Sequence, residues 1–489
     1  MMRDASSLTS ALRQAFAHHA AANRVAIEGP ASSTTYSELG ERIDRVAGGV
    51  RAWGIERGEG VAILVPRGVP AVAVFFGVMQ AGGCPCFLEP RLKAREVGAR
   101  LAAVGIRRLV VDLAELSEAD GLDEGIETRT AHSLLEAPAF AGPELGRADT
   151  AMMQFTSGST GQPKGVLLSH GNLLANAEGV LAHTGVTTED RLLHVMPLYH
   201  TNGINNQLVV PFLAGATVIL VERFKAETAV GQIARHRATY MTGVPTMYSR
   251  ILPHIGERSQ LATLRFLRCG SAPITTVLHE QIEAAFGVPL VVSYGLSEAT
   301  CTSTMNPPHA RRIGTVGTVL AGQQVKLFHA GTNDEVAPGS DGEICIAGPC
   351  LMKAYAGAGA EPPAQAGWLR TGDLGRFDAD GYLHITGRIK DVIIRGGENI
   401  APQLIEAVIA SHPAVKACCV VAGPHADLGE VPIAFVVLHD AGQTSAAELR
   451  EMVGGRLSRM YVPADVRFEA SLPENAVGKI DRKALRLRV

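Results

Sequence analysis

The chain has 489 residues, of which 46% are hydrophobic and 19% are charged, with a formal net charge of −3. This length exceeds one ordinary hydrophobic core, so two or three domains are expected. The composition is that of a globular protein, and the small net charge, spread over both signs, excludes a broad basic surface for nucleic acid. We therefore expect small-molecule partners and no nucleic acid.

The eight cysteines have no C-x-x-C pair and no histidine at the spacing of a zinc site, so we interpret them as reduced, mostly buried thiols. The first residues, MMRDASSLTSALRQAF, are charged and lack the apolar core of a signal peptide. The apolar runs at 69–79 and 208–221 are too short or are interrupted by Pro211 and Gly215. No transmembrane segment is predicted, and the cytoplasm is the expected compartment.

From residue 8 to residue 328, short β-branched runs such as VAILVP alternate with helix-like stretches such as TYSELGERIDRVAGGVRAWG. This alternation predicts βαβ units and largely parallel sheets. Residues 326–346 instead contain short alternating strands with Pro-Gly and Asp-Gly turn pairs, which indicate a small antiparallel region. The predicted fold class is α/β (α+β), with no internal repeat of fixed period.

The last hundred residues predict a separate α+β unit, in which strand-like and helix-like runs follow the sequence GRIKD at 387–391. No long linker precedes this unit, so GRIKD is interpreted as a short hinge. The predicted organisation is a large N-terminal core, residues 1–388, and a small mobile C-terminal domain, residues 389–489.

The segment TSGSTGQPKG, residues 156–165, has the composition of a phosphate-binding loop. Its glycines, hydroxyl side chains and lysine can surround an anion with N–H groups and positive charge. It differs from the common P-loop because Pro163 precedes Lys164, and Gly165 stands where a Mg²⁺-binding Ser or Thr belongs. A flexible Gly/Ser linker is the alternative, but the apolar stretches on either side argue against it.

Three charged residues elsewhere have the chemistry of a nucleotide site. Glu298, in SYGLSEAT, follows a strand-like run and is suited to Mg²⁺ beside phosphate. Asp373, in a Gly-flanked turn 15 positions before Arg388, is suited to binding two ribose hydroxyls. Lys479 lies in a basic segment near the C-terminus. Taken singly, each also fits an ordinary turn or solvent-exposed residue.

Six motifs occur in one order along the chain: TSGSTGQPKG, YGLSE, GWLRTGDLG, GRIKD, GGEN and GKIDRKAL. Their order and spacing resemble the adenylate-forming superfamily of acyl-CoA synthetases, peptide-synthetase adenylation domains and beetle luciferases. The resemblance covers essentially the whole chain. It implies ATP and Mg²⁺ as cofactors, and coenzyme A or a carrier-protein phosphopantetheine as the acceptor of an acyl group.

The resemblance also implies roles for individual residues. The loop that closes on the β- and γ-phosphates matches Thr156, Ser157, Gly158, Ser159, Thr160, Gly161 and Lys164. Thr156 and Glu298 match the Mg²⁺ positions, and Ser297 matches a hydroxyl that contacts the α-phosphate. The wall around adenine matches Gly270, Ser271, Ala272, Pro273, Tyr294 and Gly295. Asp373 and Arg388 match the ribose-binding pair.

The C-terminal motifs imply the two chemical steps. Lys479 matches the lysine that neutralises charge while a carboxylate attacks the α-phosphate of ATP. Lys390 matches the hinge about which the small domain then rotates. After rotation, Gly396, Gly397 and Glu398 of GGEN are expected to face the pantetheine thiol.

The acyl pocket is expected around the stretches PLYHTNGINNQ and GVPTMYSR and the sequence near YGLSE. Its candidate residues are His200, Asn202, Asn205, Asn206, Gly243, Arg250 and Ser293. His200 resembles the residue that moves between the two half-reactions, and packing against apolar neighbours is its alternative role.

Malonyl-CoA synthetases are similar around H-T-x-G and at the place of Arg250, but they have an arginine where this chain has Ser293. A second carboxylate would lack that charge-assisted partner, which argues against dicarboxylates. Asn202 stands where peptide synthetases have an aspartate for the α-amino group, which argues against amino acids. The expected substrate is a monocarboxylic acid, aliphatic or aromatic, with any polar substituent bound by Asn202, Asn205 or Asn206.

The expected activity is AMP-forming acid–thiol ligation, in which ATP activates the acid as acyl-AMP and CoA receives the acyl group. A stand-alone adenylation enzyme that loads a carrier protein is the alternative, because both acceptors present the same thiol. A non-catalytic ATP-binding sensor is a more distant alternative, disfavoured by the presence of Glu298, Asp373 and Lys479.

Overall fold

The structure of the protein is a computed structural model that describes residues 5–30, 32–112, 122, 125–157, 163–357, 366–440, 442–474 and 480–489. Five predicted site residues lie outside these ranges, namely Gly158, Ser159, Thr160, Gly161 and Lys479. Of Ser157, only the backbone is described.

A nine-stranded sheet forms the centre of the N-terminal part, with strand order β15-β14-β13-β12-β11-β9-β10-β1-β2. Its strands are β1 (Val25–Glu28), β2 (Ser33–Thr35), β9 (Arg191–His194), β10 (Thr217–Leu220), β11 (Tyr240–Gly243), β12 (Phe266–Cys269), β13 (Leu290–Tyr294), β14 (Thr304–Met305) and β15 (Thr318–Val319). The six strands from β13 to β1 pair in parallel, and the others pair antiparallel at the two edges. The predicted parallel α/β core is confirmed.

Successive residues of the central strands enter two different cores, as strand alternation requires. Tyr240 and Phe266 belong to one core and Met241 and Leu267 to the other. The first core contains residues of α1 (Leu8–Ala20), α2 (Tyr36–Ala52), α3 (Val69–Gln80), α7 (His170–Thr184), the π-helix η1 (Asn202–Val209) and α8 (Val210–Ala214). The second contains residues of α9 (Ala226–His236), α10 (Pro245–Ile251), η3 (Arg258–Leu261) and α11 (Thr276–Phe286).

Helix ends in this region follow local sequence signals. Helix α2 begins after Thr35, whose side chain accepts from the Glu38 N–H while the Glu38 carboxylate accepts from the Thr35 N–H. Helix α7 begins after Ser169 in the same way and ends at Gly185, which has a left-handed φ of 60°.

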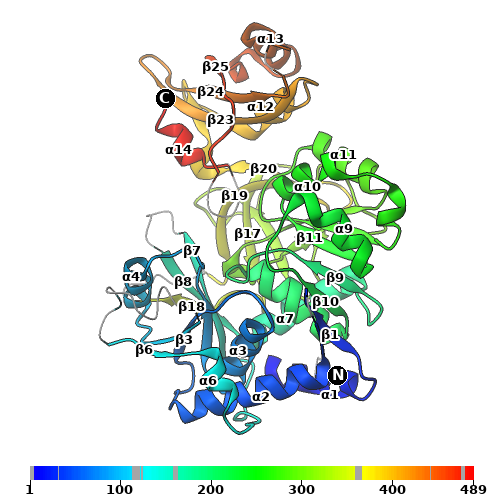
Figure 1. The fold of residues 1–489 in the computed structure, drawn as a ribbon. Coiled ribbons are helices and arrows are strands. Elements are labelled where there is room, and N and C mark those ends of the chain that lie inside the picture. The colour runs from blue at the N-terminus through cyan, green and yellow to red at the C-terminus, as the bar shows by residue number, and fades with distance from the viewer. Residues whose placement is uncertain are drawn as a thin grey trace.

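Two further sheets complete the lower left of the molecule (Figure 1). A parallel sheet has the order β4-β3-β5-β6 and consists of β3 (Gly60–Leu64), β4 (Cys84–Phe87), β5 (Arg108–Val111) and β6 (Glu127–Arg129). An antiparallel sheet consists of β7 (Thr150–Ser157), β8 (Pro163–Ser169) and β18 (Ala354–Ala356). Helices α4 (Ala94–Val104) and α6 (Ala131–Leu135) lie in this part of the chain. A strand, β8, begins at Pro163, so the predicted difference from the common P-loop, which is followed by a helix, is confirmed.

An antiparallel sheet with the order β16-β17-β19-β20 lies between the central sheet and the C-terminal unit. Its strands are β16 (Gln324–Phe328), β17 (Gly342–Ala347), β19 (Leu369–Phe377) and β20 (Leu383–Arg388). The first two strands confirm the antiparallel region predicted at 326–346.

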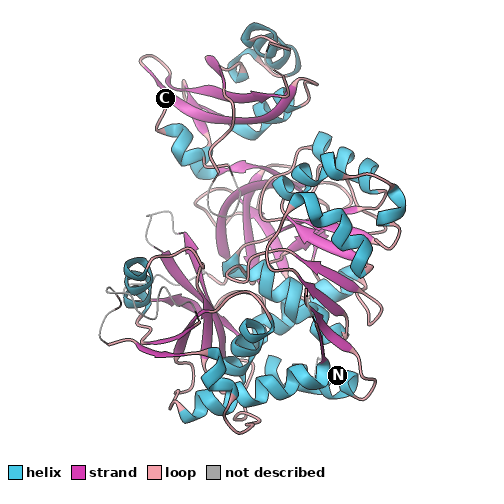
Figure 2. Cartoon of the chain, in the orientation of Figure 1, coloured by secondary structure: helices cyan, strands magenta, loops and turns pink. Residues whose placement is uncertain are grey.

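The C-terminal unit lies at the top of Figure 1, and Figure 2 shows its sheet and helices. It contains β21 (Ile393–Arg395), β22 (Glu398–Ile400), α12 (Pro402–Ala410), β23 (Val415–His425), β24 (Gly429–Leu438), α13 (Ala446–Arg456), η6 (Arg459–Tyr461), β25 (Asp465–Phe468) and α14 (Arg482–Arg486). One face of its sheet packs with α12 and α13, and the other with Leu485 of α14. The short 3-10 helix η5 (Ile389–Asp391) connects β20 to this unit. No helix in the described part of the chain has the length and hydropathy needed to cross a bilayer.

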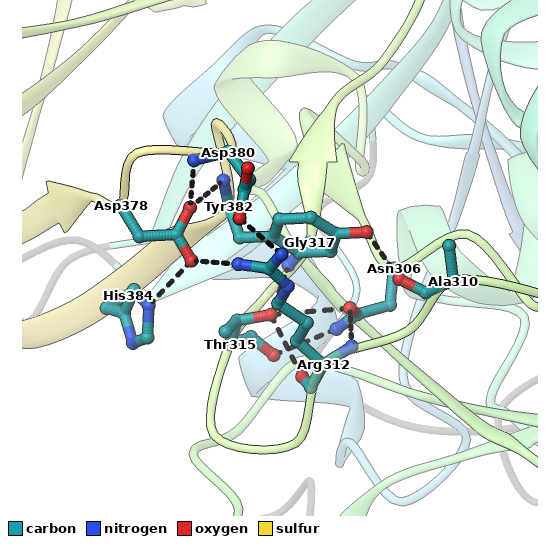
Figure 3. Close-up of polar contacts among 9 residues, drawn as sticks. All are labelled: Asn306, Ala310, Arg312, Thr315, Gly317, Asp378, Asp380, Tyr382 and His384. Atoms are coloured by element: carbon teal, nitrogen blue, oxygen red, sulfur yellow. Dashed lines mark hydrogen bonds and ion pairs between the residues drawn. The ribbon is translucent and has the colours of Figure 1, made fainter.

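A polar network holds the β19–β20 hairpin against the segment that follows β14 (Figure 3). Arg312 donates to Asp378 at 2.9 Å and to Asp380 at 2.5 Å. Its guanidinium lies 4.4 Å from the ring centroid of Tyr382, and the Tyr382 hydroxyl donates to the Ala310 carbonyl. The hairpin tip is therefore tied to the loop that carries Arg312.

Asn306 anchors the other end of this network and is fully buried. Its Oδ1 accepts from the Arg312 backbone N–H at 2.8 Å, and its Nδ2 donates to the Thr315 carbonyl at 3.0 Å. Because Asn306 directly follows β14, the network joins the edge of the central sheet to the hairpin.

We expect Asn306→Ala to destabilise the protein more than Arg312→Ala. The first leaves buried backbone groups unpaired, at a cost of roughly 1–3 kcal/mol. The second removes ion pairs of a side chain that is 43% exposed, where water screens the charges and weakens their contribution. The midpoints of thermal unfolding of the two variants test this order, and the reverse order would contradict it.

Candidate active site

The parallel strands of the central sheet end at a common edge, and several predicted site residues follow those ends. Gly243, the last residue of β11, pairs with Cys269 of β12, and Cys269 pairs with Val292 of β13. The predicted segments at 243–250, 270–273 and 293–298 therefore leave the sheet side by side. Ligands bind at this edge in open parallel α/β sheets.

Two glycines allow these segments to approach closely. A Cβ atom on Gly270 would lie 2.9 Å from the Ser293 hydroxyl oxygen. A Cβ atom on Gly295 would lie only 2.1 Å from the Cys301 carbonyl oxygen. A side chain at position 295 would collide with backbone, so Gly295 is required by packing. At position 270 the nearest atom is the Ser293 side-chain hydroxyl, so Gly270 is closely packed against a group that can rotate away.

Backbone strain is concentrated in the same segments. Ser271 has φ of 65°, Thr300 has φ of 58° and Cys301 has φ of 94°, in the region that L-residues rarely adopt. For the β-branched Thr300, this conformation is a strong outlier, and its hydroxyl donates to the Cys350 carbonyl at 2.6 Å. Strain of this kind persists where surrounding structure holds it, often at ligand sites.

Glu298 lies in the 3-10 helix η4 (Ser297–Ala299), next to the β7–β8 hairpin. Tyr355 of β18 donates its hydroxyl to the Glu298 carboxylate at 3.0 Å. The Lys164 ammonium lies 4.8 Å from the Tyr355 ring centroid. Thr156 is directly opposite Lys164 in the hairpin. Three segments far apart in sequence thus bring Thr156, Lys164 and Glu298 together, through a tyrosine that no sequence motif indicated.

The donor set around Glu298 fits a Mg²⁺ ion that is shared with phosphate. The described residues contain no group of three or more His, Cys, Asp or Glu side chains able to hold a metal ion. Mg²⁺ commonly takes one or two carboxylates and completes its shell with phosphate oxygens and water. A single carboxylate beside the hairpin has this chemistry, whereas a protein-only metal site would need more ligands.

The Asp373 carboxylate is 8% exposed and is held from two sides. Arg388, opposite Asp373 in the β19–β20 hairpin, donates from Nε to Oδ1. The Tyr294 hydroxyl, at the end of β13, donates to Oδ2 at 2.8 Å. Burial, followed by the Asp373 charge, raises the pKa of Tyr294 well above its usual range, so its hydroxyl stays a donor. Asp373 and Arg388, the pair predicted from sequence, therefore lie together at the strand edge where β13 ends in Tyr294.

The predicted acyl residues Asn202, Asn205 and Asn206 lie on η1, where all eight residues are buried. The Asn206 amide nitrogen donates to Asn202 Oδ1 at 3.2 Å and to Thr302 Oγ1 at 3.1 Å. The Asn205 amide nitrogen donates to Asn176 Oδ1 at 2.8 Å. The amide nitrogens of Asn205 and Asn206 are therefore engaged within the protein. π-Helical turns are rare and frequently occur at functional sites.

His200 and Ser297 lie at the entrance to this helix. His200 is half-buried before η1, with its ring centroid 4.7 Å from that of Tyr199. The Ser297 and Thr201 hydroxyl oxygens are 3.4 Å apart. The segment before η1 therefore meets the segment that carries Glu298.

Arg250 is not brought to the buried residues of η1. Its side chain, at the end of α10, is 54% exposed and pairs with Glu474 of the C-terminal unit at 2.8 Å. Sequence spacing could not reveal this contact, because the partner lies 224 positions away. In this structure Arg250 joins the two parts of the molecule.

The predicted hinge and thiol-facing residues lie on the C-terminal side of β20. Lys390 lies in η5, and its carbonyl accepts from Arg486 of α14 at 3.1 Å. Gly396 and Gly397, with φ of 59° and 87°, form the turn between β21 and β22, and Glu398 is exposed. The turn therefore presents its backbone to solvent.

The chain is similar in sequence to known enzymes over most of its length. The family model "AMP-binding enzyme" matches residues 13–356, and "AMP-binding enzyme C-terminal domain" matches residues 404–479. A feruloyl-CoA synthase of an Amycolatopsis species is 36% identical over 468 residues, 94% of each chain.

Two solved structures extend the comparison. ATP-bound MatB from Rhodopseudomonas palustris has a TM-score of 0.90 and 30% identity, covering 99% of both chains. O-succinylbenzoate coenzyme A synthetase from Bacillus subtilis, solved with ATP and magnesium ion, has a TM-score of 0.84 and 30% identity, covering 97% of this chain and 98% of that one. The chain therefore belongs to the AMP-binding enzyme family within the adenylate-forming superfamily, with the fold and the class of activity, AMP-forming acid–CoA ligation, that its sequence predicts.

Proposed function

We propose that this chain uses ATP and Mg²⁺ to convert a small carboxylic acid to acyl-AMP and pyrophosphate, then transfers the acyl group to the thiol of CoA. The observation that carries the proposal is the meeting of two clusters at one strand edge. One is Thr156, Lys164 and Glu298, and the other is Asp373 and Arg388. Their chemistry matches the two ends of a nucleoside triphosphate.

On the phosphate side, Lys164 and the loop that follows β7 would bind the β- and γ-phosphates. Glu298 and Thr156 would hold Mg²⁺, which when bound supplies positive charge next to the phosphates. Tyr355 orients the Glu298 carboxylate by donating to one oxygen, which leaves the other oxygen available. Ser297, one residue earlier, would contact the α-phosphate.

On the nucleoside side, the Asp373 carboxylate would accept hydrogen bonds from the two ribose hydroxyls. Arg388 and Tyr294 orient this buried carboxylate by donating to its two oxygens. The strained loop from Gly270 to Pro273 would form the adenine wall together with Tyr294 and Gly295.

Attack of a carboxylate on the α-phosphate brings two anions together, so the site needs a mobile cation at the reacting atoms. We assign this role to Lys479 on the basis of its motif; it lies outside the described residues. His200, at the entrance to η1, would line the path between acid and nucleotide.

For the second step, we propose that residues 389–489 rotate about Lys390 as one domain against residues 1–388. Rotation would break the Arg250–Glu474 pair. An exposed pair of this kind is worth about 1 kcal/mol or less, so it hinders the motion little. Gly396, Gly397 and Glu398 would then face the pantetheine arm.

The acceptor is proposed to be CoA, supported by the CoA ligases among the relatives. A carrier protein presenting the same thiol is the competing acceptor. We also propose a cytoplasmic location, which suits eight cysteines that form no disulfide.

A panel of carboxylic acids should give AMP only when acid, ATP and Mg²⁺ are present, with turnover that depends on CoA. The measurement is AMP and acyl-CoA formation with and without CoA. Adenylate formation that no concentration of CoA accelerates would instead indicate a carrier protein, and the absence of any acid-dependent AMP would contradict the proposed function.

Glu298→Gln should lower kcat/KM for AMP formation by about 100-fold or more, because a charged metal ligand is lost. Added Mg²⁺ should restore part of the activity. Tyr355→Phe removes only one hydrogen bond and should cost roughly 3- to 10-fold. Glu280→Gln, at an exposed glutamate of α11, is the matched control and should behave as wild type. Equal activity of Glu298→Gln and Glu280→Gln would remove Glu298 from the site.

Asp373→Asn should raise the KM for ATP by roughly 10- to 100-fold, because two charge-assisted hydrogen bonds are weakened. The KM for the acid should change much less. Steady-state kinetics with each substrate varied will separate these effects, with the exposed Asp341→Asn as control. A selective rise in the KM for the acid would be inconsistent with a ribose contact.

A further inference from the structure

Arg268 has the largest side chain among the fully buried residues that the structure describes, and it is 1% exposed. Its Nε and Nη2 atoms are buried and have no hydrogen-bond partner among the described residues. Burial lowers the pKa of the Arg268 guanidinium. The side chains that act against this shift are those of Tyr240, Cys301 and Tyr248, and none of them is a carboxylate. A guanidinium removed from water without a partner is costly, so a buried arginine of this kind requires an anion.

Strand alternation shows which way Arg268 points. Its neighbours Leu267 and Cys269 belong to the core under α9 to α11, whereas Phe266 belongs to the core that contains η1 and α7. Arg268 therefore points to the η1 and α7 side of the sheet. Burial, followed by the Arg268 charge, lowers the pKa of His183 on α7, which places the guanidinium on the same side.

Further buried polar groups without described partners lie on the same side of the sheet as Arg268. Thr242 is directly opposite Arg268 in the β11–β12 pair, and its hydroxyl has no partner among the described residues. Gln207 of η1 is 0% exposed, and neither its amide nitrogen nor its amide oxygen has a described partner. Native proteins leave few buried polar groups unsatisfied, so a buried arginine with such groups on its own side of the sheet indicates a ligand.

The position of Arg268 in β12 shows how far the buried polar groups lie from the strand edge at which the acid is proposed to react. Arg268 lies two residues before Gly270, which borders the strand edge. At the rise of a β-strand, this is about 7 Å below the edge. The far end of a short acid whose reacting carboxylate lies at the edge would therefore lie at about the depth of Arg268.

We propose that Arg268 binds a second anionic group, a carboxylate or a sulfonate, at the far end of a short acid substrate, with Thr242 and Gln207 as further hydrogen-bond donors. This inference rests on the proposed function, since it names the class of acid that the ligase activates. The inference differs from the sequence-based expectation of a monocarboxylic acid. That expectation rested on Ser293 of β13, which stands where malonyl-CoA synthetases have an arginine. Arg268 supplies the missing cation from the neighbouring strand, β12.

The test compares acids in matched pairs. Malonate, succinate, glutarate and sulfoacetate, the charged acids, are each assayed against the monocarboxylic acid of closest length, namely propionate, butyrate, valerate and propionate again. These partners are called uncharged because they carry no charged group besides the reacting carboxylate. We expect wild type to prefer at least one charged acid by about 100-fold or more in kcat/KM. Comparison of sulfoacetate with malonate distinguishes sulfonate from carboxylate.

Arg268→Met keeps the buried volume and removes the charge. We expect it to lose about 100-fold or more on the preferred charged acid while its activity on the uncharged partner is unchanged or rises. Arg268→Lys should retain an intermediate preference. The control is Arg235→Met, at an exposed arginine of α9, which should keep the wild-type preference.

The preference ratio within one enzyme does not depend on how much of the variant folds. If Arg268→Met lowers activity on both acids of a pair equally, the proposal fails. The wild-type enzyme alone can test the proposal, even if no Arg268 variant folds. If wild type turns over every charged acid more slowly than its uncharged partner, the proposal is overturned. CoA-dependent turnover of uncharged acids alone would leave the proposed function intact, whereas no turnover of any acid would contradict that function itself.

Discussion

The buried carboxylate of Asp373 is the contact on which the arrangement of this molecule depends. It accepts from Tyr294 at the end of the central sheet and from Arg388 at the end of β20. Arg388 is followed directly by η5, which leads into the C-terminal unit. Because a buried carboxylate without partners is costly, both contacts are held, and the central sheet is joined to the β19–β20 hairpin at one buried group. We propose the same group as the contact for the ribose of ATP.

Around this contact, the strand edge combines close packing with strain. Gly295 lets neighbouring segments approach to a distance that a side chain would prevent, and Thr300 and Cys301 adopt left-handed backbone conformations. The two cores on either face of the central sheet hold these segments in place. A rigid edge of this kind suits a site that must align an acid, a nucleotide and a cation.

Local sequence patterns predicted the parallel core, the antiparallel region at 326–346 and the C-terminal α+β unit, because strand and helix periodicity and turn pairs are local signals. They also predicted the residues that the structure gathers near Glu298 and Asp373, since those residues lie in compact motifs. The π-helix at Asn202–Val209 was not predicted, because the local sequence carries no signal that separates it from an α-helix.

The sequence by itself determined the class of chemistry, because its phosphate, ribose and lysine motifs each occupy a few consecutive residues. Only the tertiary structure decided which distant residues contact those motifs and which side chains are buried. Tyr355 reaches Glu298 across 57 positions, Arg250 meets Glu474 across 224, and Arg268 becomes a buried cation without a described partner. Burial and pairing are set by contacts between distant segments, so the selectivity of the acyl site depends on packing that no local pattern encodes.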